Sequence, residues 1–170
     1  MKPPLQRFGS GGLTLRPITE ADLDRTLGWR NREDVRIWFK TFDRIDSSQH
    51  RVWFAQYSAR DDDFVFLVEF EGAPVGQASV YGINRADRTA ELGRFIAAPE
   101  ARGRGLMDLA CAELLRFCAD TLQLTSVYLD VKEDNARAIG LYRRRGFEEE
   151  GRRDGIIRMR RSLTRDKGHG

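Results

Sequence analysis

Residues 100–110 read EARGRGLMDLA, and this stretch decides the fold because it joins a predicted strand to a predicted helix. Gly103 and Gly105 alternate there with two arginines, Arg102 and Arg104. Glycine destabilises regular structure, so a pair of glycines at a helix start indicates a backbone that bends or is approached closely. Unpaired N–H groups and the positive end of the helix dipole converge at such a junction, which makes the loop a predicted phosphate site.

Other interpretations of this loop depend on its spacing. A tight turn at a helix start needs the same glycines, so the loop alone leaves a purely structural role open. A Walker loop is excluded because no Gly-Lys-Ser/Thr sequence follows. The spacing of Gly103, Gly105 and Asp108 also fails the dinucleotide-binding pattern G-x-G-x-x-G.

The elements around the loop predict a mixed sheet. A strand at 88–98 precedes the loop, an amphipathic helix with an apolar face from Met107 to Cys118 follows it, and a strand at 126–133 comes next. This order implies a right-handed parallel crossover. The remaining strands are expected at 13–19, 64–71, 75–83, 147–153 and 156–163, with helices from Thr19 to about Trp29, from Ser47 or Ser48, and over 135–146.

Length and composition indicate a globular protein. The chain has 170 residues, of which 41% are hydrophobic and 32% charged, and this predicts one domain over 1–170. We expect an ordered core at about 12–163, with flexible ends at 1–11 and 164–170. No apolar run approaches the roughly 18 residues that span a bilayer, and the N-terminus carries no secretory signal. A cytoplasmic protein without a membrane partner is the expectation.

The charge balance favours a small anionic ligand over a polynucleotide. The net charge is +3, with 29 basic residues of which only Lys2, Lys40, Lys132 and Lys167 are lysine. Arginine suits planar phosphates and carboxylates, although a general preference for arginine explains the same bias. The 26 acidic residues nearly balance the basic ones, so no nucleic acid partner is expected. With two cysteines and two histidines in the chain, no metal site is expected either.

A second motif follows the strand at 126–133. Residues 135–146 read NARAIGLYRRRG, which places Asn135 at a helix start and Tyr142 on its last turns. Gly146 closes this helix, and Phe147 enters the next strand. Loop and helix together therefore present a phosphate site, an asparagine and a tyrosine in a fixed order.

These two stretches resemble the two signature motifs of the GNAT acetyltransferase superfamily. Residues 102–106 match its cofactor loop, Q/R-x-x-G-x-G/A, while Met107 departs from the Gly or Ala that the family usually has. The second motif, roughly N-x-x-A-x-x-x-Y-x-x-x-G-F, is matched by Asn135, Ala138, Tyr142, Gly146 and Phe147. The resemblance covers about residues 12–163. It implies an α/β (α+β), GNAT-like single domain, whose mostly antiparallel, twisted sheet has about seven strands, a splayed parallel pair and about four flanking helices.

The resemblance also implies acetyl-CoA as co-substrate, without a metal. In the family the pantetheine arm lies along the strand before the loop, here Phe95, Ile96 and Ala97. The pyrophosphate falls on the loop amides, and Asn135 is similar to the family asparagine that contacts the arm. The expected cofactor residues are thus Phe95, Ile96, Ala97, Arg102, Gly103, Arg104, Gly105, Leu106, Met107, Asn135 and Ala138.

The implied reaction is attack of an amine on a thioester. A thiol has a pKa near 8.5 and a tyrosine near 10, close enough for a positioned tyrosine to donate a proton, and Tyr142 matches the family's general acid. The general base stays open between Glu91 and Asp130, on the two strands that flank the cleft. A packing role for Tyr142, and a solvated role for either carboxylate, are the alternatives.

The acceptor is expected to be a small-molecule amine. Residues 29–54 resemble the subgroup that acetylates nucleotide-linked 4-amino sugars, as in pseudaminic acid assembly, and ordinary helix packing is the alternative. Polyamine and ribosomal-protein N-terminal acetyltransferases are similar in layout, although a basic protein attracts a polycation poorly. A non-catalytic acetyl-CoA sensor and a homodimer also stay open. The expected acceptor residues are Trp29, Arg30, Asn31, Trp38 and His50, together with Trp53.

Overall fold

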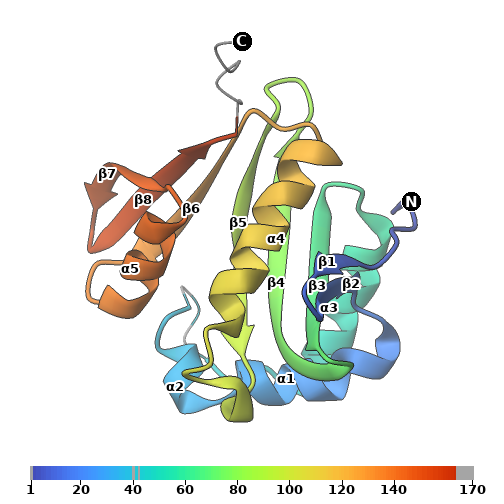
Figure 1. Ribbon diagram of the computed structural model, residues 1–170. Helices are drawn as coiled ribbons and strands as arrows, with labels where there is room; N and C mark the ends of the chain where they lie inside the picture. The colour runs from blue at the N-terminus through green and yellow to red at the C-terminus, as the bar shows by residue number, and fades with distance from the viewer. Residues whose placement is uncertain (1, 40, 42, 164–170) are drawn as a thin grey trace.

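The computed structural model describes residues 2–39, 41 and 43–163, whose strands form one twisted sheet (Figure 1). The spatial order is β1-β2-β3-β4-β5-β6-β8-β7, so the last two strands exchange places. All neighbours are antiparallel except β5 and β6. The strands are β1 (Phe8–Ser10), β2 (Leu13–Pro17), β3 (Asp63–Phe70), β4 (Ala73–Asn84), β5 (Thr89–Ala97), β6 (Ser126–Lys132), β7 (Glu148–Arg153) and β8 (Ile156–Ser162).

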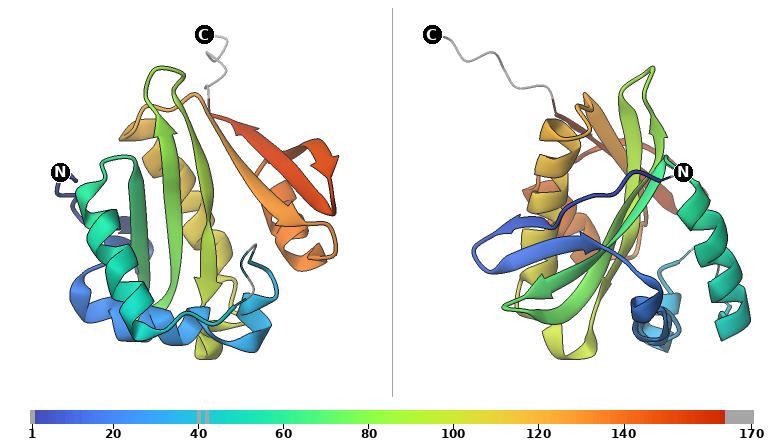
Figure 2. Two further views of the ribbon diagram at one scale, coloured as in Figure 1. Left: turned by 180° about the vertical axis from the view of Figure 1, so that it is seen from behind. Right: turned by 90° about the vertical axis from the view of Figure 1, so that its right-hand side faces the viewer.

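Helices cover both faces of the sheet (Figure 2). The longest helix, α4, packs on one face with α5 beside it, and α3 lies on the other. The apolar face of α4 is buried against β2, β4 and β5, which explains its amphipathic sequence. The helices are η1 (Glu20–Asp22), α1 (Leu23–Arg30), α2 (Glu33–Arg36), α3 (Ser47–Ala59), η2 (Pro99–Ala101), α4 (Leu106–Asp120) and α5 (Ala136–Arg144).

Strands β5 and β6 pair over a short distance and then separate. Their parallel register covers Thr89 with Ser126, Ala90 with Val127 and Glu91 with Tyr128. Strand β5 continues to Ala97, on the antiparallel register of β4 alone. The predicted splayed parallel pair and the mixed α/β fold are confirmed.

A β-bulge interrupts β5 where the two strands separate. Ser79 pairs with Gly93 and Gln77 pairs with Ile96, so β5 carries one residue more than β4 in this interval. Arg94 lies in the bulge with a φ of 53°, a left-handed conformation that is costly for a residue with a side chain. Its guanidinium makes two hydrogen bonds to Asp63 on β3, at 2.8 and 3.2 Å, which hold the bulge in place.

The N-terminal segment is more ordered than the sequence predicts. Residues 8–10 were expected in a flexible lead-in, but they form β1 on the edge of the sheet. The Phe8 ring stacks on Phe117 of α4 at 4.7 Å between centroids, and this contact supplies the ordering. The chain's other expected flexible end, 164–170, lies outside the described residues.

Two helix starts also differ from expectation. Asp46, rather than Ser47 or Ser48, caps α3: its Oδ1 accepts from the Gln49 N–H at 2.8 Å. The Gln49 side chain accepts from the Asp46 N–H in return, which completes a capping box. The short helix α2 was not expected, because four residues are too few to show a helical period.

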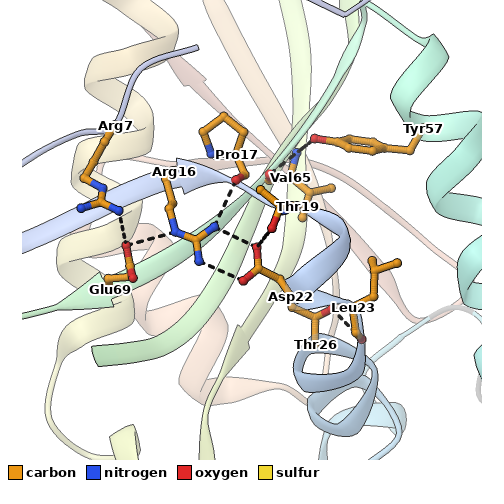
Figure 3. Close-up of polar contacts among 10 residues, drawn as sticks. All are labelled: Arg7, Arg16, Pro17, Thr19, Asp22, Leu23, Thr26, Tyr57, Val65 and Glu69. Carbon is orange, nitrogen blue, oxygen red and sulfur yellow. Dashed lines mark hydrogen bonds and ion pairs between the residues drawn. The ribbon is translucent and has the colours of Figure 1, made fainter. Parts of the chain in front are cut away.

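An ion-pair network ties the first helix to the sheet (Figure 3). Arg16 on β2 makes hydrogen bonds of 2.8 and 2.9 Å to the buried Asp22 carboxylate and one of 3.2 Å to Glu69 on β3. Asp22 also accepts from the Thr19 N–H at 2.8 Å. Although burial opposes ionisation, the contacts with Arg16 and Thr19 hold the pKa of Asp22 below its usual value. In the part of the chain that is described, no helix is long and apolar enough to cross a membrane.

Candidate active site

A cleft of about 1200 Å³ opens where β5 and β6 separate. Its volume exceeds the roughly 300–1,000 Å³ of most small-molecule sites, so a long ligand and a second molecule fit together. Most of the residues predicted from the sequence line it: Glu91, Phe95, Ile96, Ala97, Arg102, Gly103, Gly105, Leu106, Met107, Asp130, Asn135, Ala138 and Tyr142, and, at the acceptor end, Arg30, Trp38 and His50. Arg104, Trp29 and Asn31 are not part of the lining.

The glycine loop presents an open backbone at the start of α4. Gly103 and Gly105 have φ angles of 75° and 71°, and Gly105 is the N-cap residue of α4. Apart from the adjoining residues, no atom of the described chain lies within 4 Å of where a β-carbon would stand on either glycine, so a ligand has free access to the main chain. The loop therefore fits the predicted anion site, with helix N–H groups as donors.

The two loop arginines point to different partners. Arg102 lines the cleft and forms an ion pair with Asp34 of α2, which links the loop to the acceptor end. The Arg104 guanidinium lies over the Phe70 ring of β3, 5.6 Å from its centroid. Arg104 was predicted to bind the cofactor, but this position turns it away from the cleft.

The strand before the loop forms a further wall of the cleft. Ile96 is buried, whereas Phe95 and Ala97 are partly exposed towards the cleft. Among the described residues β5 has no β6 partner beyond Glu91, so its backbone groups on that edge are open to an extended ligand. This is the segment predicted to hold a pantetheine arm.

Tyr142 of α5 stands opposite this strand. Its ring centroid lies 5.8 Å from that of Phe95 and 5.8 Å from that of Phe147. In the described part of the chain its hydroxyl has no hydrogen-bond partner. Burial, and to a lesser extent the nearby Cys111, raise the pKa of Tyr142, so the hydroxyl stays protonated.

Asn135 has a local structural role as well as a place in the cleft. Its Oδ1 accepts a hydrogen bond of 3.3 Å from the Ala138 N–H and so caps α5. The cap joins two residues of the second sequence motif and orients the helix that carries Tyr142.

The two candidate carboxylates differ in their partners. Asp130 on β6 accepts two hydrogen bonds from Arg158 of β8, at 2.9 and 3.1 Å. Glu91 on β5 accepts one hydrogen bond of 2.8 Å, from the Tyr81 hydroxyl on β4. A carboxylate held by a bidentate guanidinium is a weak base, so the geometry favours Glu91 for proton abstraction.

Residues of α1, α2 and α3 line the end of the cleft that is predicted to receive the acceptor. His50 stacks on Trp53 at 5.2 Å between centroids and lies 3.4 Å from the Thr26 hydroxyl. Arg30 donates to the Thr41 carbonyl at 2.7 Å and lies 4.2 Å from the centroid of Phe39. These contacts place two predicted acceptor residues on the cleft wall.

Two predicted acceptor residues serve packing instead. Asn31 exchanges hydrogen bonds of 2.7 and 2.8 Å with the Ile45 backbone and so fixes the segment before α3. Trp29 is 7% exposed and belongs to the core. The Asn31 amide is held by the Ile45 backbone and the Trp29 ring is packed in the core, so neither side chain lines the cleft.

Among the cleft residues that were not predicted from the sequence, three lie close to Glu91. Tyr81, Gly93 and Arg94 line the cleft beside Glu91. Their meeting depends on the register between β4 and β5 and on the bulge, neither of which strand alternation shows. The sequence offered one signal for this bulge: the alternation of apolar and polar residues breaks at Gly93–Arg94. A glycine within a strand often marks a bulge or a close contact.

Comparison with known proteins now assigns the fold and the cleft to a family. The family model described as "Acetyltransferase (GNAT) domain" matches residues 12–148. The chain belongs to the GNAT acetyltransferase family. This confirms the family, the enzyme class and acetyl-CoA as the acetyl donor predicted above.

Individual relatives show which kinds of acetyltransferase this chain is similar to. The spermidine N(1)-acetyltransferase of Escherichia coli K12 is 31% identical over 142 residues, which are 81% of this chain and 73% of that protein. A provisionally named ribosomal N-acetyltransferase of Bacillus subtilis is 32% identical over 105 residues, 61% of this chain and 56% of that one. The Vibrio cholerae spermidine N-acetyltransferase, solved with CoA and spermine, superposes with a TM-score of 0.82 at 24% identity, covering 89% and 96% of the two chains.

These relatives correct one expectation. They are polyamine and ribosomal acetyltransferases, and they give no support to the nucleotide-linked amino-sugar subgroup. The residues that carried that resemblance include Trp29 and Asn31, whose pattern reflects packing between α1 and the segment before α3.

Proposed function

We propose that this acetyltransferase acts on a primary amine of a polyamine, with Glu91 as general base and Tyr142 as general acid. One observation supports these two roles: Glu91 and Tyr142 line the same cleft, on opposite sides of the opening between β5 and β6. The polyamine class is supported by the spermidine acetyltransferases among the relatives.

The cleft fits acetyl-CoA on its own geometry. Helix N–H groups beside Gly103 and Gly105 would hold the pyrophosphate, where no side chain obstructs the backbone. The unpaired edge of β5 from Phe95 to Ala97 would hold the amide groups of the arm. Bound there, acetyl-CoA supplies a thioester whose carbonyl carbon accepts the amine and whose sulfur departs.

Glu91 and Tyr142 divide the proton transfers between them. The Glu91 carboxylate takes a proton from the acceptor's ammonium group, which frees the nitrogen lone pair for attack. Tyr142 holds a proton on Oη that it gives to the departing sulfur, and the second proton that the nitrogen loses as the amide forms restores the hydroxyl. Burial that raises the pKa of Tyr142 raises the pKa of a thiol in the same site as well, so the two acids stay matched.

Charges at the acceptor end suit a cationic ligand in one region of the cleft. The carboxylates of Glu91, Asp130 and Asp43 line it. Two adjacent arginines are neutralised by partners, Arg94 by Asp63 and Arg158 by Asp130. Because Asp130 is paired with Arg158, an amine that enters here meets Glu91 as a carboxylate that no arginine pairs among the described residues, despite the basic pI of 9.1.

The test is an acceptor panel followed by CoA thiol release. Spermidine and spermine should turn over, with one added acetyl group detected by mass. Ribosomal-protein N-terminal peptides form the second arm, because one relative carries a ribosomal name. Turnover of peptides without turnover of polyamines would overturn the acceptor class and leave acetyl transfer intact. A dodecameric structure of the Vibrio cholerae enzyme makes an oligomer part of the proposal, to be measured by light scattering.

A further inference from the structure

Glu91 is held by a tyrosine from the neighbouring strand. Tyr81 on β4 is the register partner of Glu91 on β5, and its hydroxyl donates a 2.8 Å hydrogen bond to Glu91 Oε2. The bond engages one carboxylate oxygen and leaves Oε1 to receive a proton. Burial, together with the hydrogen bond to Glu91, raises the pKa of Tyr81, so the hydroxyl remains a donor.

Gly93 provides the space for this contact. A β-carbon at position 93 would collide with the Tyr81 hydroxyl and stand 3.1 Å from both Cε1 and Cζ of the ring. Gly93 does not have a positive φ, so the backbone itself does not demand glycine here. The missing side chain therefore serves the position of Tyr81.

Arg94 fixes the other face of the tyrosine. Its guanidinium carbon lies 4.3 Å from the Tyr81 ring centroid, and Asp63 holds the guanidinium with two hydrogen bonds. The bulge at Arg94 makes this stacking possible, because it turns the side chain back over β4. A continuous chain of contacts thus runs from Asp63 through Arg94 and Tyr81 to Glu91.

We propose that Tyr81 is a positioning residue that orients the Glu91 carboxylate for proton abstraction. The inference rests on the proposed role of Glu91 as base and adds a specific partner to it.

Other charged groups near Glu91 come from each neighbouring strand. Arg94 lies on β5 itself, Tyr128 and Asp130 on β6, and Arg158 on β8. Arg158 is committed to Asp130, and Arg94 to Asp63. Removing the Tyr81 hydroxyl leaves these pairs in place, so the change in kcat reports on the tyrosine.

The experiment measures kcat, and the KM for acetyl-CoA and for the amine, in Tyr81→Phe, Gly93→Ala and the double variant. Losing one hydrogen bond should lower kcat about threefold to tenfold. The KM for acetyl-CoA should not change. Gly93→Ala should lower kcat as well by displacing the hydroxyl, and it should add less in the Tyr81→Phe background, where only the 3.1 Å contacts with the ring carbons remain.

Two further variants distinguish failure of the positioning role from failure of the base assignment. Tyr57→Phe is the matched control: it removes another buried hydroxyl, which accepts from the Val65 N–H at 3.0 Å outside the cleft lining, and should leave kcat in place. A wild-type kcat in Tyr81→Phe, with Glu91→Gln inactive, would overturn the positioning role alone. A fully active Glu91→Gln variant would overturn the base assignment, and the positioning role with it.

Discussion

The Sδ atom of Met107 lies against the main chain of Gly76, so that a β-carbon at position 76 would stand 2.7 Å from it. The sequence raised the question of where Met107 points, because the family has a small residue there. The thioether packs on β4 at Gly76, and Met107 is also one of the residues that line the cleft. Gly76 has no side chain and thus leaves room on β4 for the large side chain of Met107.

Replacing Gly76 with alanine should disturb both walls of the cofactor path. The new methyl group would collide with the Ile96 carbonyl oxygen on β5 as well as with Met107. Overpacking of this kind costs about 1–3 kcal/mol of folding stability, and the displaced strand should raise the KM for acetyl-CoA. Thermal denaturation and initial rates check this.

Gly151→Ala is the matched control for that substitution. Among the described residues, only its chain neighbours come within 4 Å of where its β-carbon would stand, and Gly151 lies on the exposed β7. It should keep the wild-type Tm and KM. A Gly76→Ala variant with lowered Tm and an unchanged acetyl-CoA KM would contradict a cofactor path along residues 95–97.

The sequence predicts most of this fold because apolar periodicity is strong where elements are long. Strands β3 to β6 and helix α4 were all expected within a few residues of their bounds. Strand β1 was missed, since three residues show no alternation and its order comes from Phe8 packing on Phe117. The glycine loop and Tyr142 were found because their spacing is local, whereas Tyr81 and Arg94 depend on cross-strand register.

Gly105→Ala should weaken acetyl-CoA binding through strain in the loop. Its φ of 71° is left-handed, and alanine there costs about 1–2 kcal/mol. If the loop relieves that strain by moving, affinity for acetyl-CoA should fall roughly tenfold. Gly155→Ala is the control, because its φ of 78° imposes similar strain in the turn between β7 and β8, outside the cleft lining. Calorimetric titration that finds equal acetyl-CoA affinity in both variants would show that the loop does not bind the phosphates.

Tyr142→Phe should lower kcat by about 10²–10⁴-fold, the usual contribution of a general acid, with little change in the KM for acetyl-CoA. The ring contacts with Phe95 and Phe147 do not involve the hydroxyl, so the variant should fold normally. Because burial raises the pKa of Tyr142, wild-type activity should show no loss from tyrosine ionisation up to about pH 10. Tyr57→Phe controls for loss of a buried hydroxyl. Near-normal kcat in Tyr142→Phe would assign the proton donor elsewhere.

His50 should make the protein less stable as the solution becomes mildly acidic. Burial, with the nearby Arg51 and Arg30, lowers the pKa of His50 below its ordinary 6.5. Between the lowered pKa of His50 in the folded protein and the ordinary value of 6.5, the unfolded chain binds the proton more readily than the folded chain does. Unfolding is therefore favoured as the pH falls below 6.5. The wild-type Tm should therefore drop more between pH 7.5 and 5.5 than the Tm of His50→Gln, whose side chain cannot titrate but can still reach Thr26. Parallel Tm curves for the two proteins would show that His50 ionises equally easily in the folded and unfolded chains.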